Sequence, residues 1–315
     1  MFKALLFGCG NIGARYDLNL DSVLSHAKAY SLDSDFLVDA YDTNPNYLDE
    51  VGRKYGFGLI SDFKNIRFSD YDMVSICSPT ETHVNLLELC FQEKVKLILC
   101  EKPISYDKEK INFILGLYAK GDSRVIVNYI RRFQHGFLKL KEILAEILKV
   151  DTLVGIDIRY CRGFLNNCSH ALDLIEFIFG SELSLDDIKI SEKNYDSFSE
   201  DPTISLLAKW NGYTVSVSGK TNIHYPVFEI DFYFGNHRIR IQNSGNDIEV
   251  LSSLLLNERL EIFSGKNSIT ITHCLENYML PVFHKAKQFL LKETDADNFV
   301  NSSLLNLKML GYLNG

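Results

Sequence analysis

The stretch Phe2-Lys3-Ala4-Leu5-Leu6-Phe7, followed at once by Gly8-Cys9-Gly10-Asn11-Ile12-Gly13, decides the fold. The first six residues are mostly apolar and predict a buried strand, and the next six form a G-x-G-x-x-G turn ahead of a predicted helix. In such a turn the first glycine permits a sharp bend, the second lets a pyrophosphate approach the backbone, and the third lets helix and strand pack closely. A purely structural glycine turn is the alternative. The predicted dinucleotide contacts are Gly8, Gly10, Asn11, Ile12 and Gly13.

Beyond this turn, short apolar runs alternate with segments of helical spacing. Runs that are apolar on both faces suit the strands of a parallel sheet covered by helices. The predicted strands are Leu37–Tyr41, Met73–Cys77, Leu97–Cys100 and Val125–Asn128, with helices near Thr82–Glu93 and Asp107–Ala119. We therefore predict an α/β fold whose N-terminal domain, residues 1–128, is a Rossmann domain with a doubly wound parallel sheet.

After residue 128 the pattern changes to that of a second domain, residues 129–315. Asn211-Gly212 and Gly235-Asn236 separate strand-like runs and favour hairpin turns, which predicts an α+β domain with an open, mainly antiparallel sheet. The runs are Leu153–Tyr160, Thr203–Trp210, Tyr213–Gly219, Phe228–Phe234 and His237–Gln242. Helices are expected at Ser169–Phe179, Leu275–Leu291 and Ser302–Leu313, and the last one can pack back on the first domain.

Composition excludes several classes of protein. The 315 residues carry 33 Lys and Arg against 41 Asp and Glu, a net charge of −8 that argues against nucleic-acid binding. No apolar run is long enough to cross a membrane, and no signal segment is recognisable. Seven cysteines without a Cys-x-x-Cys pair, and histidines without metal spacing, indicate reduced core thiols and no metal site. We expect a cytoplasmic protein.

Two further segments follow predicted strands and are candidates for the cofactor site. Asp42 ends the second strand, where a carboxylate accepts hydrogen bonds from ribose hydroxyls and repels a 2′-phosphate, favouring NAD over NADP. Its distance from Gly8 exceeds the usual spacing because Tyr16–Ser25 reads as an insertion; a solvated turn residue is the alternative. Ser78-Pro79-Thr80-Glu81 reads as a capping box with a proline start, beside the expected cofactor crevice. Ser78, Pro79, Thr80 and His83 are its candidate contacts, although His83 also suits a packed structural role.

Two segments carry candidate chemistry. Glu101-Lys102-Pro103 ends a strand, so Lys102 points into the crevice, and a cis Pro103 would aim it. In Asn166-Asn167-Cys168-Ser169-His170, Ser169 is a plausible helix cap that places His170 in the first turn. The positive helix end there favours the neutral imidazole that a general base needs. A surface lysine before a turn is the alternative interpretation of Lys102.

These motifs, in this order and spacing, resemble those of the Gfo/Idh/MocA oxidoreductases. The likeness also rests on Ser25-His26-Ala27-Lys28-Ala29-Tyr30, Arg131-Arg132-Phe133 and Ser169-His170-Ala171-Leu172-Asp173. The resemblance implies hydride transfer between NAD(P) and a ring hydroxyl or ketone of a sugar, cyclitol or nucleotide sugar. It also implies a homodimer or homotetramer formed through the C-terminal sheet, an association that an uncovered apolar face would favour.

By the same resemblance, Lys102 matches the catalytic lysine and His170 matches the catalytic histidine. Glu101, the residue before the lysine, matches a cofactor contact, and Arg131 matches a cofactor or substrate contact. One position departs from the pattern. Asn166 stands where many members carry an aspartate, and it can orient His170 but cannot stabilise imidazolium by charge. Arg162 is a further candidate for gripping an anionic substrate.

The expected reaction is reversible alcohol oxidation, with His170 as base and Lys102 stabilising the alkoxide. A redox-assisted lyase or glycosidase that reduces NAD only transiently is an alternative. A cofactor-binding regulator without activity is another, which Asn166 makes conceivable and the presence of both Lys102 and His170 disfavours.

Overall fold

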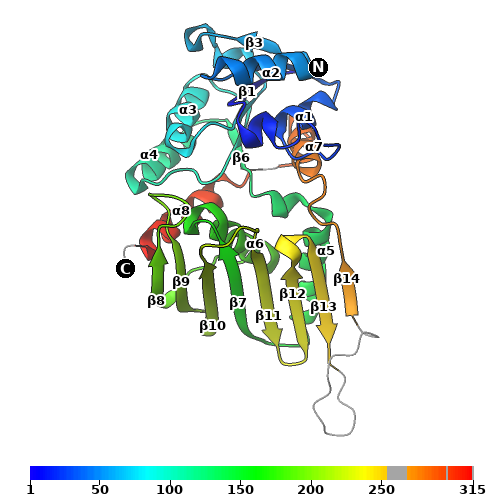
Figure 1. Cartoon of the computed structure of the whole chain (residues 1–315), viewed down its shortest axis with the longest axis vertical. Coiled ribbons are helices and arrows are strands. Elements are labelled where there is room, and N and C mark those ends of the chain that lie inside the picture. The colour runs from blue at the N-terminus through cyan, green and yellow to red at the C-terminus, as the bar shows by residue number, and fades with distance from the viewer. Residues whose placement is uncertain (254–267, 296, 314–315) are drawn as a thin grey trace. The chain divides into compact units, whose positions relative to one another are not determined.

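The computed structural model describes residues 1–253, 268–295 and 297–313 (Figure 1). The chain forms two compact units. Unit 1 contains Met1–Phe133 and Glu276–Leu307, and unit 2 contains Gln134–Leu275 and Lys308–Gly315. Helix α8, Phe299–Tyr312, begins in unit 1 and ends in unit 2.

Unit 1 is built on a six-stranded sheet with the order β3-β2-β1-β4-β5-β6, in which every pair of neighbours is parallel. The strands are β1 Phe2–Phe7, β2 Phe36–Tyr41, β3 Gly58–Ile60, β4 Met73–Ile76, β5 Leu97–Cys100 and β6 Arg124–Val127. All residues of β4 and β5 are buried, as the runs apolar on both faces predict. The strand order reverses between β1 and β4, which is where ligands bind in doubly wound sheets.

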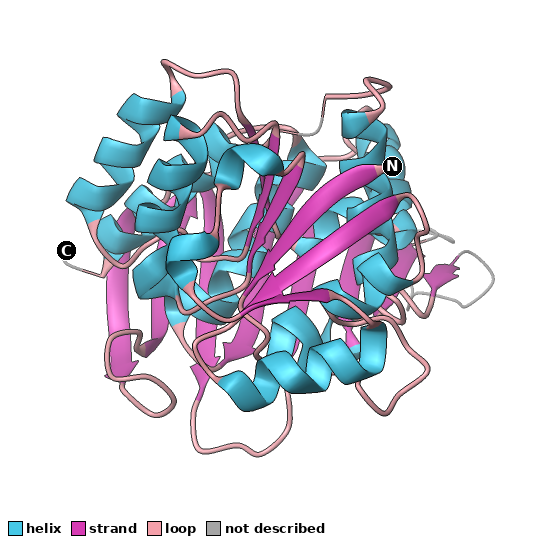
Figure 2. Cartoon of the chain, turned by 90° about the horizontal axis from the view of Figure 1, so that it is seen from above, coloured by secondary structure: helices cyan, strands magenta, loops and turns pink. Residues whose placement is uncertain are grey.

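Helices lie on both sides of this sheet, as Figure 2 shows from above. They are α1 His26–Ser31, α2 Pro45–Tyr55, α3 Thr80–Gln92, α4 Lys108–Tyr118 and, from the later segment, α7 Met279–Leu290. Local sequence sets their ends. The side chain of Asn44 caps α2, Pro45 opens it, and Gly56 closes it in the left-handed region with a φ of 69°. The doubly wound parallel sheet predicted from the sequence is therefore confirmed, and β3 is a further strand that the sequence analysis did not predict.

The chain after the glycine turn forms two helical pieces separated by an insertion, as the sequence predicts. A five-residue π-helical turn, Asn11–Arg15, ends early, and α1 begins only after the stretch Tyr16–Ser25 that the spacing marks as an insertion. The buried carboxylate of Asp17 explains this detour. It accepts hydrogen bonds from the backbone N–H groups of Leu24 and Ser25, at 2.6 and 2.8 Å, and from the Ser25 hydroxyl.

Unit 2 contains an eight-stranded sheet with the order β14-β13-β12-β11-β7-β10-β9-β8. Only the pair β7–β10 is parallel among its described neighbours. The strands are β7 Leu153–Cys161, β8 Asp186–Asn194, β9 Thr203–Trp210, β10 Tyr213–Lys220, β11 Phe228–Phe234, β12 His237–Gln242, β13 Asp247–Ser252 and β14 Ser268–Ile271. The mainly antiparallel sheet is thus confirmed. Asn211 and Gly212 turn β9 into β10 with positive φ values of 49° and 85°.

Two helices, α5 His135–Ile147 and α6 Ser169–Phe179, lie against one face of this sheet (Figure 1). The ring of Phe179 contacts Trp210 of β9 and Phe232 of β11, with centroids 5.1 and 5.8 Å apart. Helix α5 buries Phe137, Leu140 and Leu144 at helical spacing. These apolar side chains form the core of unit 2.

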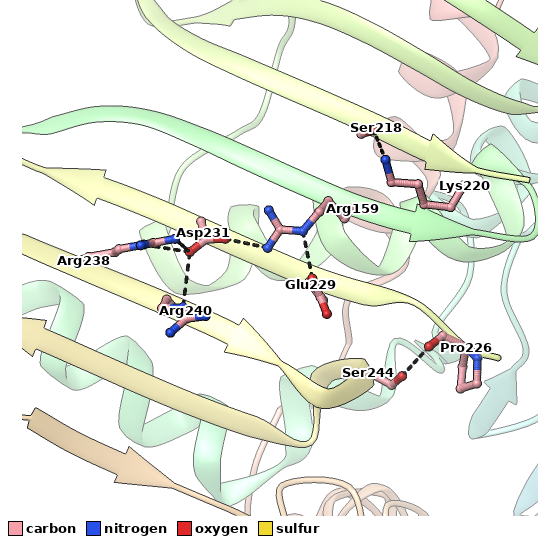
Figure 3. A network of polar contacts seen from close by, with 9 residues as sticks. All are labelled: Arg159, Ser218, Lys220, Pro226, Glu229, Asp231, Arg238, Arg240 and Ser244. Carbon is pink, nitrogen blue, oxygen red and sulfur yellow. Dashed lines mark hydrogen bonds and ion pairs between the residues drawn. The ribbon is translucent and has the colours of Figure 1, made fainter. Parts of the chain in front are cut away.

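The opposite face of the sheet is charged where β7, β11 and β12 run side by side (Figure 3). The carboxylate of Asp231, 2% exposed, lies within 2.6 Å of Arg159, 2.8 Å of Arg238 and 3.7 Å of Arg240. Arg159 also pairs with Glu229 at 2.8 Å. The centre of this face is therefore ionic, because alternate residues of these strands are charged. Self-association through the sheet stays a prediction.

All seven cysteines are buried and unpaired, in agreement with reduced core thiols. Within the described ranges, no helix is both long and apolar enough to cross a bilayer. The same residues bring together no group of three or more His, Cys, Asp or Glu side chains suited to a metal ion.

We predict that Asp231→Ala lowers the free energy of unfolding by about 3 kcal/mol, because it leaves three guanidinium groups around a vacated buried site. Glu229→Ala is the matched control, since Glu229 is 36% exposed and its loss should cost less than about 1 kcal/mol. Urea unfolding of both variants measures the difference. Equal losses of unfolding free energy in the two variants would show that burial of Asp231 does not strengthen its contribution to stability.

Candidate functional site

The glycine turn is shaped by close backbone contacts. Gly8 has a φ of +99°, and a Cβ there would lie 2.7 Å from the carbonyl carbon of Cys77 and from the nitrogen of Ser78. A Cβ on Gly13 would collide with the carbonyl oxygen of Gly8. Both positions thus require glycine for the reasons expected of the first and third glycines of the motif.

Gly10 is different, because no atom lies within 4 Å of the place its Cβ would take. Its carbonyl oxygen accepts the N–H groups of Ala14 and Arg15, at 2.9 and 3.1 Å. Asn11 is exposed, and Ile12 packs against the core. The turn therefore presents backbone to open space, which is the cradle that a pyrophosphate needs at the second glycine.

Asp42 is fixed beside this turn. Its Oδ2 accepts the backbone N–H of Cys9 at 2.6 Å, and its Oδ1 accepts the N–H of Asn44 at 2.7 Å. The contact with Asn44 is that of a turn residue, and the contact with Cys9 ties the carboxylate to the glycine motif. A carboxylate offers about four acceptor positions, so capacity for ribose hydroxyls is left.

The segment after β4 does not form the predicted capping box. Helix α3 begins at Thr80 with Pro79 before it, and no side chain caps its N-terminus. The hydroxyl of Ser78 lies 2.6 Å from that of Thr82 instead, and the Thr82 hydroxyl donates to the carbonyl oxygen of Pro79 at 2.8 Å. The box fails because the helix starts one residue later than the spacing implies. Ser78 and Thr80 still stand at the carboxyl end of β4.

His83 supports two loops of the crevice. Its ring is 1% exposed, and its nitrogens lie 2.9 Å from the carbonyl oxygens of Pro103 and Ser78. Burial lowers the pKa of His83, although both carbonyl contacts act in the opposite direction. The ring thus joins the segments after β4 and β5, which favours the packed role for this residue.

Lys102 follows β5 and is half-buried, and its peptide bond to Pro103 is cis. The backbone N–H groups of Ile104 and Ser105 both donate to Oδ1 of Asn306 in α8, at 3.0 and 3.2 Å. The sequence gives no signal for this partner, because about two hundred residues separate it from the loop. It fixes the chain directly after the lysine.

Glu101 is buried with an exposure of 8%, and its Oε1 lies 3.0 Å from Nε2 of His26 and 2.6 Å from Nδ2 of Asn128. Arg131, also buried, lies in the 3₁₀ turn Ile130–Phe133 that follows β6. In unit 1 the predicted residues thus stand at the carboxyl ends of parallel strands, which share one edge of the sheet. Sequence reasoning missed Asn128, and it took His26 only as part of a resemblance.

In unit 2, the segment carrying Asn166 and His170 is helical earlier than expected. A π-helical turn, Phe164–Cys168, runs directly into α6, so Ser169 lies inside the helix and is not its cap. The capping group is the buried carboxylate of Asp201, which accepts the N–H groups of Leu165 and Asn166 at 2.8 and 2.7 Å. It was missed because it lies 35 residues beyond Asn166 in the sequence.

The expected side chains surround the start of this helical segment. Nδ2 of Asn166 donates to the carbonyl oxygen of Arg162 at 3.1 Å, and Arg162 is exposed with a positive φ of 66°. His170 is half-buried in the first turn of α6, and Asp173 is buried one turn later. Arg159 belongs to the ionic network of the sheet.

Comparison with known proteins supports this description. Residues 2–129 match the family model described as "Oxidoreductase family, NAD-binding Rossmann fold". Inositol 2-dehydrogenase of Rhizobium meliloti (strain 1021) is 28% identical over 191 residues, which are 56% of this chain and 54% of that protein. The chain therefore spans about half the length of this curated relative.

Solved structures share the fold of the whole chain. A UDP-N-acetylglucosamine 3-dehydrogenase from Acidithiobacillus ferrooxidans superposes with a TM-score of 0.76 at 14% identity, covering 99% of this chain and 96% of that one. An oxidoreductase from Agrobacterium radiobacter, in complex with NAD+, L-tartaric acid and magnesium, gives 0.70 at 18% identity, covering 99% and 94%.

We predict that Gly10→Ala and Gly13→Ala separate binding from folding. Gly13→Ala should lower the free energy of unfolding by about 2 kcal/mol through its clash with Gly8, whereas Gly10→Ala should leave it unchanged. Gly10→Ala should instead weaken NAD binding at least about tenfold, because its methyl group occupies the open space. Thermal unfolding and calorimetric NAD titration measure the two effects. Equal destabilisation of both variants would contradict the assignment.

Proposed function

We propose, from the premise that this chain belongs to the Gfo/Idh/MocA oxidoreductase family, that it is an NAD-dependent dehydrogenase. Its substrate would be a ring CH–OH group of a sugar, cyclitol or nucleotide sugar. The observation that carries the proposal is the open glycine turn of unit 1, fixed to Asp42 at the carboxyl edge of the sheet, where Lys102 follows β5. The names of the relatives, inositol and nucleotide-sugar dehydrogenases, support this substrate class.

The residues present fit the dinucleotide. The backbone around Gly10 would hold the pyrophosphate, and the carboxylate of Asp42 would accept hydrogen bonds from the ribose hydroxyls. A 2′-phosphate would meet the charge of Asp42 at close range, so we propose NAD in preference to NADP. When bound, NAD supplies an acceptor for the hydrogen that leaves the substrate carbon with its electron pair.

The side chains of this protein supply the remaining chemistry. His170 takes the hydroxyl proton of the substrate, and the Lys102 ammonium stabilises the negative charge that develops on the oxygen. The carbinol carbon becomes the carbonyl carbon of a ketone, and the proton from the hydroxyl group is left on His170. General-base and electrostatic contributions of this kind are each worth roughly 10²–10⁴-fold in rate. Arg131 and Arg162 are proposed to bind polar or anionic groups of the substrate.

Asn166 fits an orienting role. Its amide nitrogen donates to the carbonyl of Arg162, and its own N–H is held by Asp201. An amide in place of a carboxylate supplies no charge to an imidazolium, so the proton on His170 must leave to solvent rather than be stabilised by this residue.

We predict that Lys102→Ala and His170→Ala each reduce turnover at least about 100-fold, because each removes a group that acts on charge in the transition state. NADH absorbance with a panel of inositols, sugars and nucleotide sugars is the measurement, and product analysis distinguishes net oxidation from transient oxidation in a lyase. Lys108→Ala, an exposed position on α4, is the control. Full turnover in both variants would refute the proposed chemistry.

We predict that Asp42→Ser lowers the preference for NAD over NADP, expressed as the ratio of kcat/KM values, at least about tenfold, because it removes the carboxylate that repels the 2′-phosphate. Asp62→Ser, at another short turn of unit 1, is the matched control and should leave the ratio unchanged. An unaltered ratio in the Asp42 variant would show that Asp42 stabilises the turn and does not determine the preference for NAD.

A further inference from the structure

The Glu101 side chain is an ionisable group enclosed by protein next to the proposed catalytic lysine. Its hydrogen-bond partners His26 and Asn128 belong to different elements, since His26 opens α1 and Asn128 follows β6. Both partners are almost completely buried, with exposures of 0% and 1%. A carboxylate enclosed in this way is stable as an anion only when donors surround it.

Each partner is itself held in place. The His26 ring stands edge-on to Phe283 of α7, with centroids 5.6 Å apart, and its helix is capped by Ser25, which Asp17 fixes. The backbone N–H of Asn128 donates to the carbonyl oxygen of Cys100 at 2.8 Å. The Glu101 carboxylate is therefore held by His26 of α1, which packs on α7, and by Asn128 after β6.

Electrostatics favour the ionised form of Glu101. Burial raises the pKa of Glu101, but the hydrogen bond and charge of His26, the hydrogen bond of Asn128 and the charge of Lys102 outweigh burial and lower it. The charge of Glu101 also raises the pKa of four other titratable groups, which are His83, Cys77, Cys100 and Tyr278. Lys102 is thus a cation that acts on Glu101, whereas burial lowers the pKa of His83 and raises those of Cys77, Cys100 and Tyr278, which favours the neutral form of all four.

We propose that Glu101 is a positioning residue whose ionised carboxylate, held by His26 and Asn128, keeps Lys102 charged and in place. This rests on the proposed function of Lys102. Desolvation beside a nicotinamide cation alone would favour the neutral amine, and an adjacent fixed anion opposes that. Lys102 then acts as a hydrogen-bond donor to the substrate oxygen rather than as a base. The proposal replaces the expectation that the Glu101 side chain contacts the cofactor.

The charge state of Lys102 can be measured without turnover. Wild-type protein and Glu101→Gln are labelled with trace acetic anhydride across a pH series, and peptide mass spectrometry gives the labelling rate of each lysine, because only the neutral amine reacts. The Lys102 curve of Glu101→Gln should move about one pH unit lower. Exposed Lys108 and Lys110 serve as internal references that do not move.

Three further variants keep the test decisive if Glu101→Gln does not fold. Asn128→Ser should shift the Lys102 curve in the same direction by a smaller amount, and Glu101→Asp, which keeps the charge, should restore most of the wild-type curve. Tyr30→Phe, which removes the buried hydrogen bond to Ser75 and keeps the ring that packs on Phe283, should leave the curve unchanged. An unchanged Lys102 curve in Glu101→Gln and Asn128→Ser overturns the proposal.

Kinetics then separate this inference from the proposed function. In the active enzyme, Glu101→Gln should move the alkaline limb of the pH profile of kcat about one unit lower and change the Kd for NAD less than about threefold. Loss of NAD affinity without a shift of the Lys102 labelling curve would indicate that the Glu101 side chain contacts the cofactor, and would overturn the inference. If the Lys102 labelling curve shifts but the protein turns over no member of the substrate panel, the proposed function is wrong, whereas the effect of Glu101 on the charge of Lys102 is supported.

Discussion

The constraint on which unit 1 depends is the approach of the Gly8 backbone to the backbone of Cys77 and Ser78. No side chain fits between them, so the turn after β1 and the loop after β4 meet directly. Hydrogen bonds continue the same contact, since the N–H of Gly8 donates to Tyr41 and the N–H of Cys77 donates to Phe7. The ends of three neighbouring strands are thereby joined, and the open space at Gly10 lies on this rigid support.

Three carboxylates, of which Asp17 and Asp201 are buried and Asp42 is half-buried, hold backbone that lies outside regular structure. Asp42 holds the N–H of Cys9, Asp17 holds the start of α1, and Asp201 holds the turn that carries Asn166. In each case a charged acceptor satisfies backbone donors that an irregular turn leaves without helix or strand partners. The three functional segments are therefore held by charge-assisted hydrogen bonds rather than by apolar packing alone.

The sequence predicted the parts of the fold that local chemistry determines. Strands β1, β5, β9, β11 and β12 lie at the residues that apolar patterning indicates, and the Asn211-Gly212 turn has the conformation its residues favour. Strand β8 was missed because its side chains are mostly polar and exposed, and β14 because none of its four residues is buried. The patterning signal needs one buried face, which these strands lack.

At the candidate site, too, the sequence predicted the roles that depend on nearby residues and missed those that depend on distant ones. Glycine spacing predicted the steric roles of Gly8 and Gly13, which depend on nearby backbone. The capping roles assigned to Ser78 and Ser169 were wrong, because helix starts are decided by partners that spacing does not reveal. Asp201, Asn128 and Asn306 all act from distant positions, and no local pattern marks an asparagine or aspartate that becomes a partner only after folding.

The hydrogen bonds from Asn306 to the loop after Lys102 have a consequence for synthesis of the chain. The ribosome completes the first 133 residues long before it reaches residues 276–307, which belong to the same unit. An N-terminal domain usually folds while the rest is still being made. Here the lysine loop must wait, without its final anchor, until a partner 202 positions later leaves the exit tunnel. A stalled nascent chain would therefore carry the loop after Lys102 without the anchor that Asn306 provides.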